Sequence, residues 1–184
     1  MNLKIYRGTH EIGGTCVGIS AGKTRILVDL GMPLVSPKDK KQKLDTSGFK
    51  KLKATDLLEL GILPKVPGLY DEHDPCAIDA ILLSHPHQDH YGLLGYVRKD
   101  IPVYIGEPAK RLIDASDIFL PGKTLLTNTK LVTPGKTFQI GDFKISSYLM
   151  DHSAFDSLSF LIEAEGKKVF YSGDFRAHGR KAGL

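Results

Sequence analysis

Three histidines and an aspartate follow one another closely at the end of an apolar run. The run covers residues 80–83 and stops at Ser84. An apolar run of this length that ends at a turn signal is typical of a buried strand, so we expect the polar cluster on a loop at a strand end. Imidazole and carboxylate groups are the ligands that zinc and similar divalent ions prefer, so this loop is predicted to bind metal. The cluster consists of His85, His87, Asp89 and His90.

The spacing within this loop suggests that it contacts two ions. A regular helix or strand cannot point all four groups one way, but a loop restricted by Pro86 can turn them towards one centre. His85 and His87 are predicted to hold one ion, and Asp89 and His90 to reach a second. The alternative is a surface loop that is rich in histidine by chance. Because the chain has only seven histidines and three lie here, we favour the metal site.

Two further predicted strand ends carry potential ligands. The strand at 143–149 is followed by His152, and a hairpin of strands at 157–163 and 168–171 is followed by Asp174. A single histidine there is usually a loop residue, and Gly-Asp is usually a turn. At the ends of neighbouring strands, however, these groups describe a two-metal site with a carboxylate between the ions. Two such ions activate a water molecule, so the predicted reaction class is hydrolysis.

Alternating and helical patterns predict the remaining elements. Asp29 ends one predicted strand beside a glycine, where a lone aspartate is as often a turn former as a functional group. Helices are expected near 55–60, over 91–98 and over 107–119, the last from its amphipathic spacing. Strands are expected at 3–7, 15–21, 25–29, 80–83, 101–105, 131–132 and 137–140.

The most basic stretch runs from Ser36 to Lys53 and lacks a clear apolar period. We expect it to form part of an irregular excursion over residues 36–75. Lysine runs are usually solvated faces, but this one could also attract the phosphates of a nucleic acid. Its candidate phosphate contacts are Lys40, Lys41, Lys50 and Lys51.

Composition sets the broad class. The 184 residues suit a single domain over 1–184, with ordinary hydrophobic and charged contents of 41% and 25%. No run reaches the roughly 20 apolar residues that cross a bilayer, and residues 1–7 lack a signal-peptide core. Two cysteines give no disulfide framework, so a cytoplasmic location is expected. The net charge of +4 permits an anionic partner without requiring one.

The histidine loop resembles the His-x-His-x-Asp-His signature of the metallo-β-lactamase fold superfamily. Asp29, His152 and Asp174 match the other strand-end motifs of that superfamily in order, so the resemblance covers essentially the whole chain. Within the superfamily the chain looks most like the β-CASP RNA-processing nucleases, which include ribonuclease J and the cleavage-factor endonucleases. The segments that carry this likeness are His10-Glu-Ile-Gly-Gly-Thr, Asp29-Leu-Gly, Ser84-His-Pro-His and Tyr171-Ser-Gly-Asp-Phe-Arg.

The resemblance implies a role for each of these positions. His85, His87 and His152 would hold one zinc ion, Asp89 and His90 would hold the other, and Asp174 would bridge them. Manganese or iron could replace zinc. Catalytic roles are implied for Asp89, His152 and Asp174, with Asp89 orienting the attacking water. Asp29 would support the ligand loops from behind, and Arg176 would join the lysines as a nucleic-acid contact.

The implied fold is an αββα sandwich of the α/β class whose second half is incomplete. We expect a mixed, largely antiparallel sheet with helices on its outer face. The superfamily's last metal ligand is a histidine beyond the fourth motif, and His178 is the only histidine after Asp174. We therefore expect the chain to be the N-terminal part of a longer enzyme, completed by a C-terminal half or a partner chain.

Three functions remain open at this point. The leading hypothesis is a two-zinc phosphodiesterase that acts on RNA. The second is a metallohydrolase of a thioester, lactone or lactam, because the ligand loop is common to all these chemistries. The third is an inactive fragment or an RNA-binding module that uses the lysine-rich segment.

Overall fold

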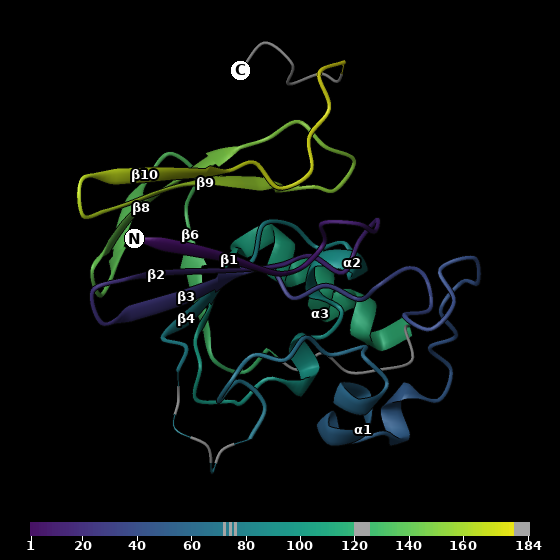
Figure 1. Cartoon of the computed structure of the whole chain (residues 1–184). Coiled ribbons are helices and arrows are strands. Elements are labelled where there is room, and N and C mark those ends of the chain that lie inside the picture. Colours follow the sequence, from purple (N-terminus) through teal and green to yellow (C-terminus); the bar gives the residue numbers. More distant parts are fainter. Residues whose placement is uncertain (72, 74, 76, 120–125, 179–184) are drawn as a thin grey trace.

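The structure is a computed structural model of the chain, and it describes residues 1–71, 73, 75, 77–119 and 126–178. Two β-sheets lie face to face, and helices lie on the other side of the first sheet (Figure 1). The predicted sandwich class is therefore confirmed. The first sheet is the expected mixed sheet with helices on its outer face, and a second sheet of four strands packs against it (Figure 1). Alternation predicts each strand but does not determine which strands pair.

The first sheet has six strands in sequence order and mixed polarity. The pairs β1–β2 and β2–β3 are antiparallel, whereas β3–β4, β4–β5 and β5–β6 are parallel. Within the parallel half, β4 and β5 contribute to the apolar cores on both faces of the sheet, which explains why these two strands are apolar and mostly buried. The strands are β1 (Asn2–Arg7), β2 (Cys16–Ala21), β3 (Thr24–Val28), β4 (Ala80–Leu82), β5 (Val103–Gly106) and β6 (Thr129–Val132).

The second sheet has four antiparallel strands in the order β10-β9-β8-β7. The predicted hairpin turn at Glu165-Gly166 joins β9 to β10, and both of its residues have positive φ angles, which suits a tight hairpin. The strands are β7 (Thr137–Ile140), β8 (Phe143–Leu149), β9 (Leu158–Ala164) and β10 (Lys167–Tyr171).

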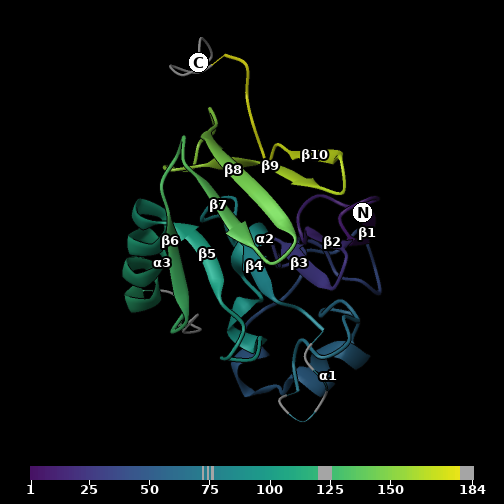
Figure 2. The ribbon, with the colours of Figure 1, turned by 90° about the vertical axis from the view of Figure 1, so that its left-hand side faces the viewer.

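Three α-helices and two 3-10 turns complete the described elements: η1 (Phe49–Lys51), α1 (Ala54–Glu59), α2 (Gln88–Tyr91), η2 (Leu94–Tyr96) and α3 (Glu107–Phe119). The predicted helix over 107–119 is confirmed at both ends, and Figure 2 shows it beside β6. The helix expected over 91–98 is wrong, because the chain forms α2 and η2 instead. Gly92 and Gly95 lower the helix propensity of that stretch.

Each face of the first sheet contributes to a separate apolar core. Ile26, Val28 and Leu82 face the second sheet and pack with Phe143 and Phe160. The opposite face of the sheet packs against the helices and the segment between β3 and β4. Full burial of one such side chain contributes about 1.5–3 kcal/mol, so the two cores hold the strand ends in place.

The segment expected as an irregular excursion is attached to the core. It contains η1 and the short helix predicted near 55–60, which the structure places at 54–59 as α1. Leu57, Leu63 and Leu69 are almost completely buried in the helix-side core. Their apolar side chains anchor the segment, whereas the lysine side chains that the structure describes there are exposed. Among the described residues, no helix is long and apolar enough to cross a membrane.

Candidate metal centre

Five of the six predicted ligands converge at one edge of the sandwich. His85, His87 and His152 form one group whose ligand atoms lie within 4.8 Å of one another, and His85, His90 and Asp174 form a second. His152 Nε2 lies 3.2 Å from His87 Nδ1. The Asp174 carboxylate lies between the groups, with Oδ1 3.4 Å from His90 Nε2 and Oδ2 3.8 Å from His152 Nε2.

Asp89 lies at the margin of this cluster. Its Oδ2 is 4.0 Å from His90 Nε2, and neither group of potential ligands includes it. Its backbone carbonyl accepts a hydrogen bond from Gly14 N at 3.1 Å. A Cβ on Gly31 would lie 1.6 Å from the same carbonyl oxygen, so this approach requires glycine. The glycine-rich segments after β1 and β3 therefore pack against the backbone of the ligand loop. Neither group includes His178.

Three chain segments supply the ligands. The loop after β4 and helix α2 carry His85, His87 and His90, whereas the loops after β8 and β10 carry His152 and Asp174. Leu158 N donates a hydrogen bond to Ser84 O at 2.8 Å, which joins the first loop to the second sheet. Strands far apart in the sequence thus bring their polar ends to one place, as expected for the carboxyl ends of neighbouring strands.

Asp29 holds the ligand loop from beneath. Its side chain is completely buried, and its φ of 59° is a left-handed conformation that aspartate tolerates. Its Oδ1 accepts a hydrogen bond from Ser84 N at 2.8 Å. Its Oδ2 accepts hydrogen bonds from Ser84 Oγ and His90 Nδ1, both at 2.7 Å, and from Tyr171 OH at 2.6 Å. This geometry fits the predicted supporting role of Asp29.

The hydrogen bonds also determine which nitrogens face the cluster. Ser84 Oγ has one proton, which it donates to Asp29, so His85 Nδ1 must donate to Ser84 Oγ across their 2.9 Å contact. The lone pair of His85 then resides on Nε2. This atom is buried and has no hydrogen-bond partner among the described residues. Because buried polar atoms are rarely left unpaired, a divalent cation fits this position.

Charge and burial set the protonation of these groups. Burial, with a smaller contribution from nearby His90, lowers the pKa of His85 to about 3, so its imidazole is neutral. Burial also disfavours a charge on His90, but the hydrogen bond to Asp29 and the negative charges of nearby carboxylates together outweigh this and raise its pKa. For Asp29, burial is outweighed by the hydrogen bonds that it accepts, foremost from His90, and its pKa is lowered.

The loop that carries His152 is fixed at its far end by Asp156. This buried residue has a φ of 61°, and its Oδ2 accepts a hydrogen bond from Ala109 N at 3.3 Å in the first turn of α3. A carboxylate at this end of a helix is also stabilised by the helix dipole. No sequence pattern predicted a role for Asp156, Ser84 or Tyr171, although Ser84 and Tyr171 lie inside the motif segments that resemble the superfamily.

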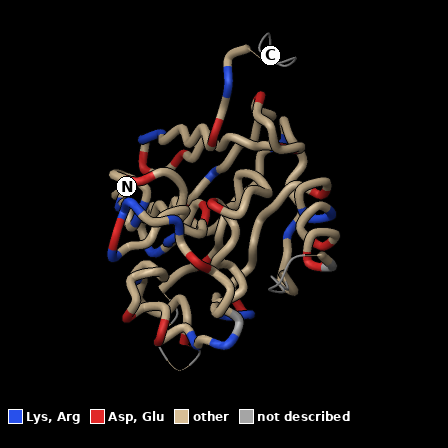
Figure 3. Tube along the Cα trace, turned by 90° about the vertical axis from the view of Figure 1, so that its right-hand side faces the viewer, with Lys and Arg blue, Asp and Glu red and all other residues tan. Residues whose placement is uncertain are grey.

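Arg176 and the lysines lie outside the ligand cluster. Arg176 Nε is 3.4 Å from Asp151 Oδ1, and Arg176 N donates to Asp151 O at 2.8 Å, so this residue joins the loops after β8 and β10. Lys40, Lys41 and Lys51 are exposed, and the side chain of Lys50 lies outside the described part of the structure. Figure 3 shows basic and acidic residues interspersed along the chain.

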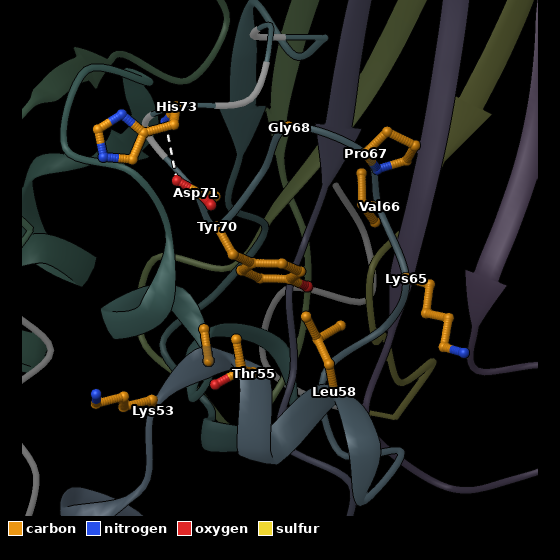
Figure 4. Close-up of a pocket in the computed structure, with 11 residues that line it drawn as sticks. Lys53, Thr55, Leu58, Lys65, Val66, Pro67, Gly68, Tyr70, Asp71 and His73 are labelled. Carbon is orange, nitrogen blue, oxygen red and sulfur yellow. Dashed lines mark hydrogen bonds between the residues drawn. The ribbon is translucent and has the colours of Figure 1, made fainter.

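A cavity of about 720 Å³ lies beside α1 and shares no lining residue with the ligand cluster. Figure 4 shows the Tyr70 ring above Leu58 and Thr55, with Lys53 and Lys65 on either side. The Tyr70 hydroxyl donates to Pro64 O at 2.9 Å, which fixes the ring. This cavity is therefore separate from the groups that could bind metal.

Comparison with known proteins agrees with this geometry. The family model described as "Beta-lactamase superfamily domain" matches residues 54–183, which include all six predicted ligands. The chain belongs to this superfamily. The matched range includes the histidine loop that follows β4.

Two curated relatives match nearly the whole chain. Ribonuclease J of Helicobacter pylori (strain ATCC 700392 / 26695) is 28% identical over 172 residues, covering 92% of this chain and 22% of the relative. An RNase J-like protein of Methanocaldococcus jannaschii is 27% identical over 183 residues, covering 94% of this chain and 36% of the relative. The superfamily chain described here therefore spans between about a fifth and a third of the length of these relatives.

Solved structures confirm the fold. A protein of unknown function from Enterococcus faecalis V583 superposes with a TM-score of 0.76 at 21% identity, covering 97% of this chain and 44% of that one. The metallo-beta-lactamase fold protein YhfI from Bacillus subtilis gives a TM-score of 0.57 at 17% identity, covering 94% and 61%. At these identities the likeness concerns the fold alone.

Proposed function

We propose that this chain is the metal-binding part of a metal-dependent hydrolase that cleaves phosphodiester bonds in RNA. The observation that carries the proposal is the convergence of imidazole and carboxylate groups from three strand ends around the unpaired, buried Nε2 of His85. Two relatives with ribonuclease names cover almost all of this chain, which supports RNA as the substrate.

The donor set suits two divalent cations. His85, His87 and His152 would hold one ion, because three imidazoles are a common zinc set. His90, Asp89 and Asp174 would hold the second. The two oxygens of Asp174 face different groups, so this carboxylate is the proposed bridge. Zinc suits the nitrogen-rich set best, and manganese or iron is the alternative.

Bound ions would supply Lewis acidity for attack of water on a phosphodiester. The protein's own groups would orient the reactants. The Asp89 side chain is 20% exposed at the margin of the cluster, where its carboxylate can accept a proton from the attacking water. Asp29 and Ser84 hold the imidazoles in one tautomer, so Nε2 of His85 and of His90 faces the cluster without rearrangement.

We further propose that a longer polypeptide or a partner chain completes the substrate site. The chain covers only 22% and 36% of the two relatives, and Asp174 is half exposed at the edge of the cluster. Lys40, Lys41, Lys50, Lys51 and Arg176 are the proposed RNA contacts. The cytoplasmic location and the β-CASP branch also stay predictions.

The test combines metal analysis with a substrate panel. His87→Ala is compared with wild type and with His73→Ala, an exposed histidine that belongs to neither ligand group. Metal content is measured after dialysis, and hydrolysis is measured on labelled RNA, a thioester, a lactone and a lactam. Hydrolysis is measured with the completing polypeptide or partner chain present. We expect bound metal and RNA cleavage in wild type and His73→Ala, and loss of both in His87→Ala.

Three outcomes would contradict the proposal. RNA cleavage by chelated protein at the metal-loaded rate would refute the metal mechanism. Hydrolysis of the thioester, lactone or lactam without RNA cleavage would favour the alternative substrate class. Salt-dependent RNA binding and bound metal without any cleavage would make this chain a binding module rather than a nuclease.

A further inference from the structure

We propose that Tyr171 is a positioning residue that couples the two halves of the metal centre through Asp29. The inference rests on the ligand assignment of the proposed function. It goes beyond that assignment because no described hydrogen bond joins Tyr171 to a potential metal ligand. Its hydroxyl acts through a buried carboxylate instead.

The contact joins the two sheets. Tyr171 is the last residue of β10 in the second sheet, whereas Asp29 follows β3 in the first. The Tyr171 hydroxyl donates to Asp29 Oδ2 at 2.6 Å, and Asp29 is completely buried. A short hydrogen bond from a hydroxyl to a buried carboxylate is among the stronger kinds. Of the side chains that bond to this carboxylate in the described structure, Tyr171 is the one from the second sheet.

The same oxygen of Asp29 orients the ligands of the first sheet. Oδ2 accepts hydrogen bonds from His90 Nδ1 and from Ser84 Oγ, and Ser84 in turn holds His85. His90 and His85 are therefore set by the position of this one atom. Tyr171 bonds to that atom, so movement of the β10 end and movement of both imidazoles are linked.

Asp174 follows Tyr171 on a short, closely packed connection. Gly173 has a φ of 57°, and a Cβ at this position would lie 3.2 Å from Ser84 Cβ. The backbone thus passes directly over the residue that links Asp29 to His85. Fixing Tyr171 at Asp29 therefore also fixes where Asp174 begins, and it sets the 3.4 Å separation between Asp174 Oδ1 and His90 Nε2.

Removal of the hydroxyl should loosen one group of ligands more than the other. Asp174 and His90 belong to the second group, and His90 bonds directly to the same Asp29 oxygen as Tyr171. In the first group, His85 is linked to Tyr171 only indirectly, through Ser84 and Asp29. His87 and His152 are not linked to Tyr171 through any described hydrogen bond. Partners that orient metal ligands typically change metal affinity by roughly 10–100-fold. We expect Tyr171→Phe to weaken one of two bound ions by that factor and to leave the other within about threefold.

The experiment is a cobalt titration of metal-free protein followed by zinc competition against a chelator. The variant is Tyr171→Phe, and the matched control is Tyr148→Phe on β8 of the same sheet, where the side chain is 45% exposed. Cobalt absorption reports the geometry at each ion, which a general loss of stability would not change. Urea unfolding of each metal-free protein measures that stability separately.

The expected result is selective weakening of one ion and a changed cobalt spectrum in Tyr171→Phe, with Tyr148→Phe like wild type. Unchanged affinities and spectrum would overturn the inference. Equal weakening of both ions with an unchanged spectrum and a lower unfolding midpoint would also overturn it, because that pattern describes a purely structural tyrosine. Wild-type protein that binds no metal would refute the proposed function and this inference together. Wild-type protein that binds two ions and hydrolyses a thioester, lactone or lactam but not RNA would refute the proposed function alone.

Discussion

Replacement of Asp29 by asparagine or alanine tests the network beneath the metal centre without requiring any metal. The Asp29 carboxylate is completely buried and accepts one hydrogen bond at Oδ1 and three at Oδ2. Asparagine has a similar shape but only one acceptor oxygen and no charge. Alanine removes every acceptor and leaves the donors of Ser84, His90 and Tyr171 without this partner.

The size of the effect follows from the number of buried donors. A buried donor left unsatisfied costs about 1–3 kcal/mol, and breaking a buried charged pair costs about 3–5 kcal/mol. The hydroxyls of Ser84 and Tyr171 can rotate and recover part of this loss. We therefore expect Asp29→Ala to lower the free energy of unfolding by about 3–5 kcal/mol, and Asp29→Asn by about 2 kcal/mol.

The dependence on pH identifies the carboxylate as the source of this stability. The pKa of Asp29 is lowered in the folded protein, foremost by the hydrogen bond from His90 against the cost of burial. Stability from a lowered carboxyl pKa is present above the unfolded value, close to 3.8, and is lost as the pH falls through the folded value. The difference between wild type and Asp29→Asn should therefore shrink below about pH 4. Between about pH 7 and 5 it should not shrink, because Asp29 also raises the pKa of His90, and the stability from that raised pKa is lost only as the pH rises.

Urea unfolding of the metal-free proteins measures these differences. The control is Asp79→Asn, an exposed carboxylate whose Oδ2 accepts one backbone hydrogen bond from Arg25 at 2.7 Å. We expect the free energy of unfolding of the control to fall by about 1 kcal/mol or less. If Asp29→Ala lowers the free energy of unfolding at pH 7 by less than about 1 kcal/mol, the stabilising role of the Asp29 hydrogen bonds is refuted. A difference that instead shrinks between pH 7 and 5 would show that another group carries the linkage.

Three further predictions concern protonation, packing and charge. Nitrogen-detected NMR of metal-free protein at pH 6.5 should show neutral His85 and protonated His90, because the pKa of His85 is lowered and that of His90 is raised. Two neutral rings would contradict this prediction. Phe160→Ala should lower the free energy of unfolding, measured in urea, by about 3–5 kcal/mol, because the ring is fully buried between the sheets. Phe170 is 58% exposed, so Phe170→Ala should lower it by under about 1 kcal/mol. Equal losses in the two variants would refute the assigned core. Replacing four lysines with glutamine should weaken RNA binding and reduce its logarithmic salt dependence by about 0.7 per lost phosphate contact, and an unchanged slope would make the segment a solvated surface. The four are Lys40, Lys41, Lys50 and Lys51.

Local patterns predicted most elements because each depends on nearby residues. The helix at 107–119 and the hairpin of β9 and β10 were identified from periodicity and turn residues alone. The division into two sheets was not, because alternation marks an apolar face without naming the face that it meets. The prediction of a helix over 91–98 was wrong for a related reason. The apolar spacing there matches a helix, but two glycines lower the helix propensity, and the chain forms two short turns of helix instead.

The sequence by itself determined which chemical groups end each strand: imidazoles after β4 and β8, and carboxylates after β3 and β10. Only the tertiary structure decided how they combine. It set Asp89 at the margin, placed Asp174 between the two groups, and joined Tyr171 to Asp29 across 142 positions of the chain. Such contacts depend on how the two sheets pack over their shared core. That packing is a collective property of many buried side chains, and no local spacing of residues encodes it.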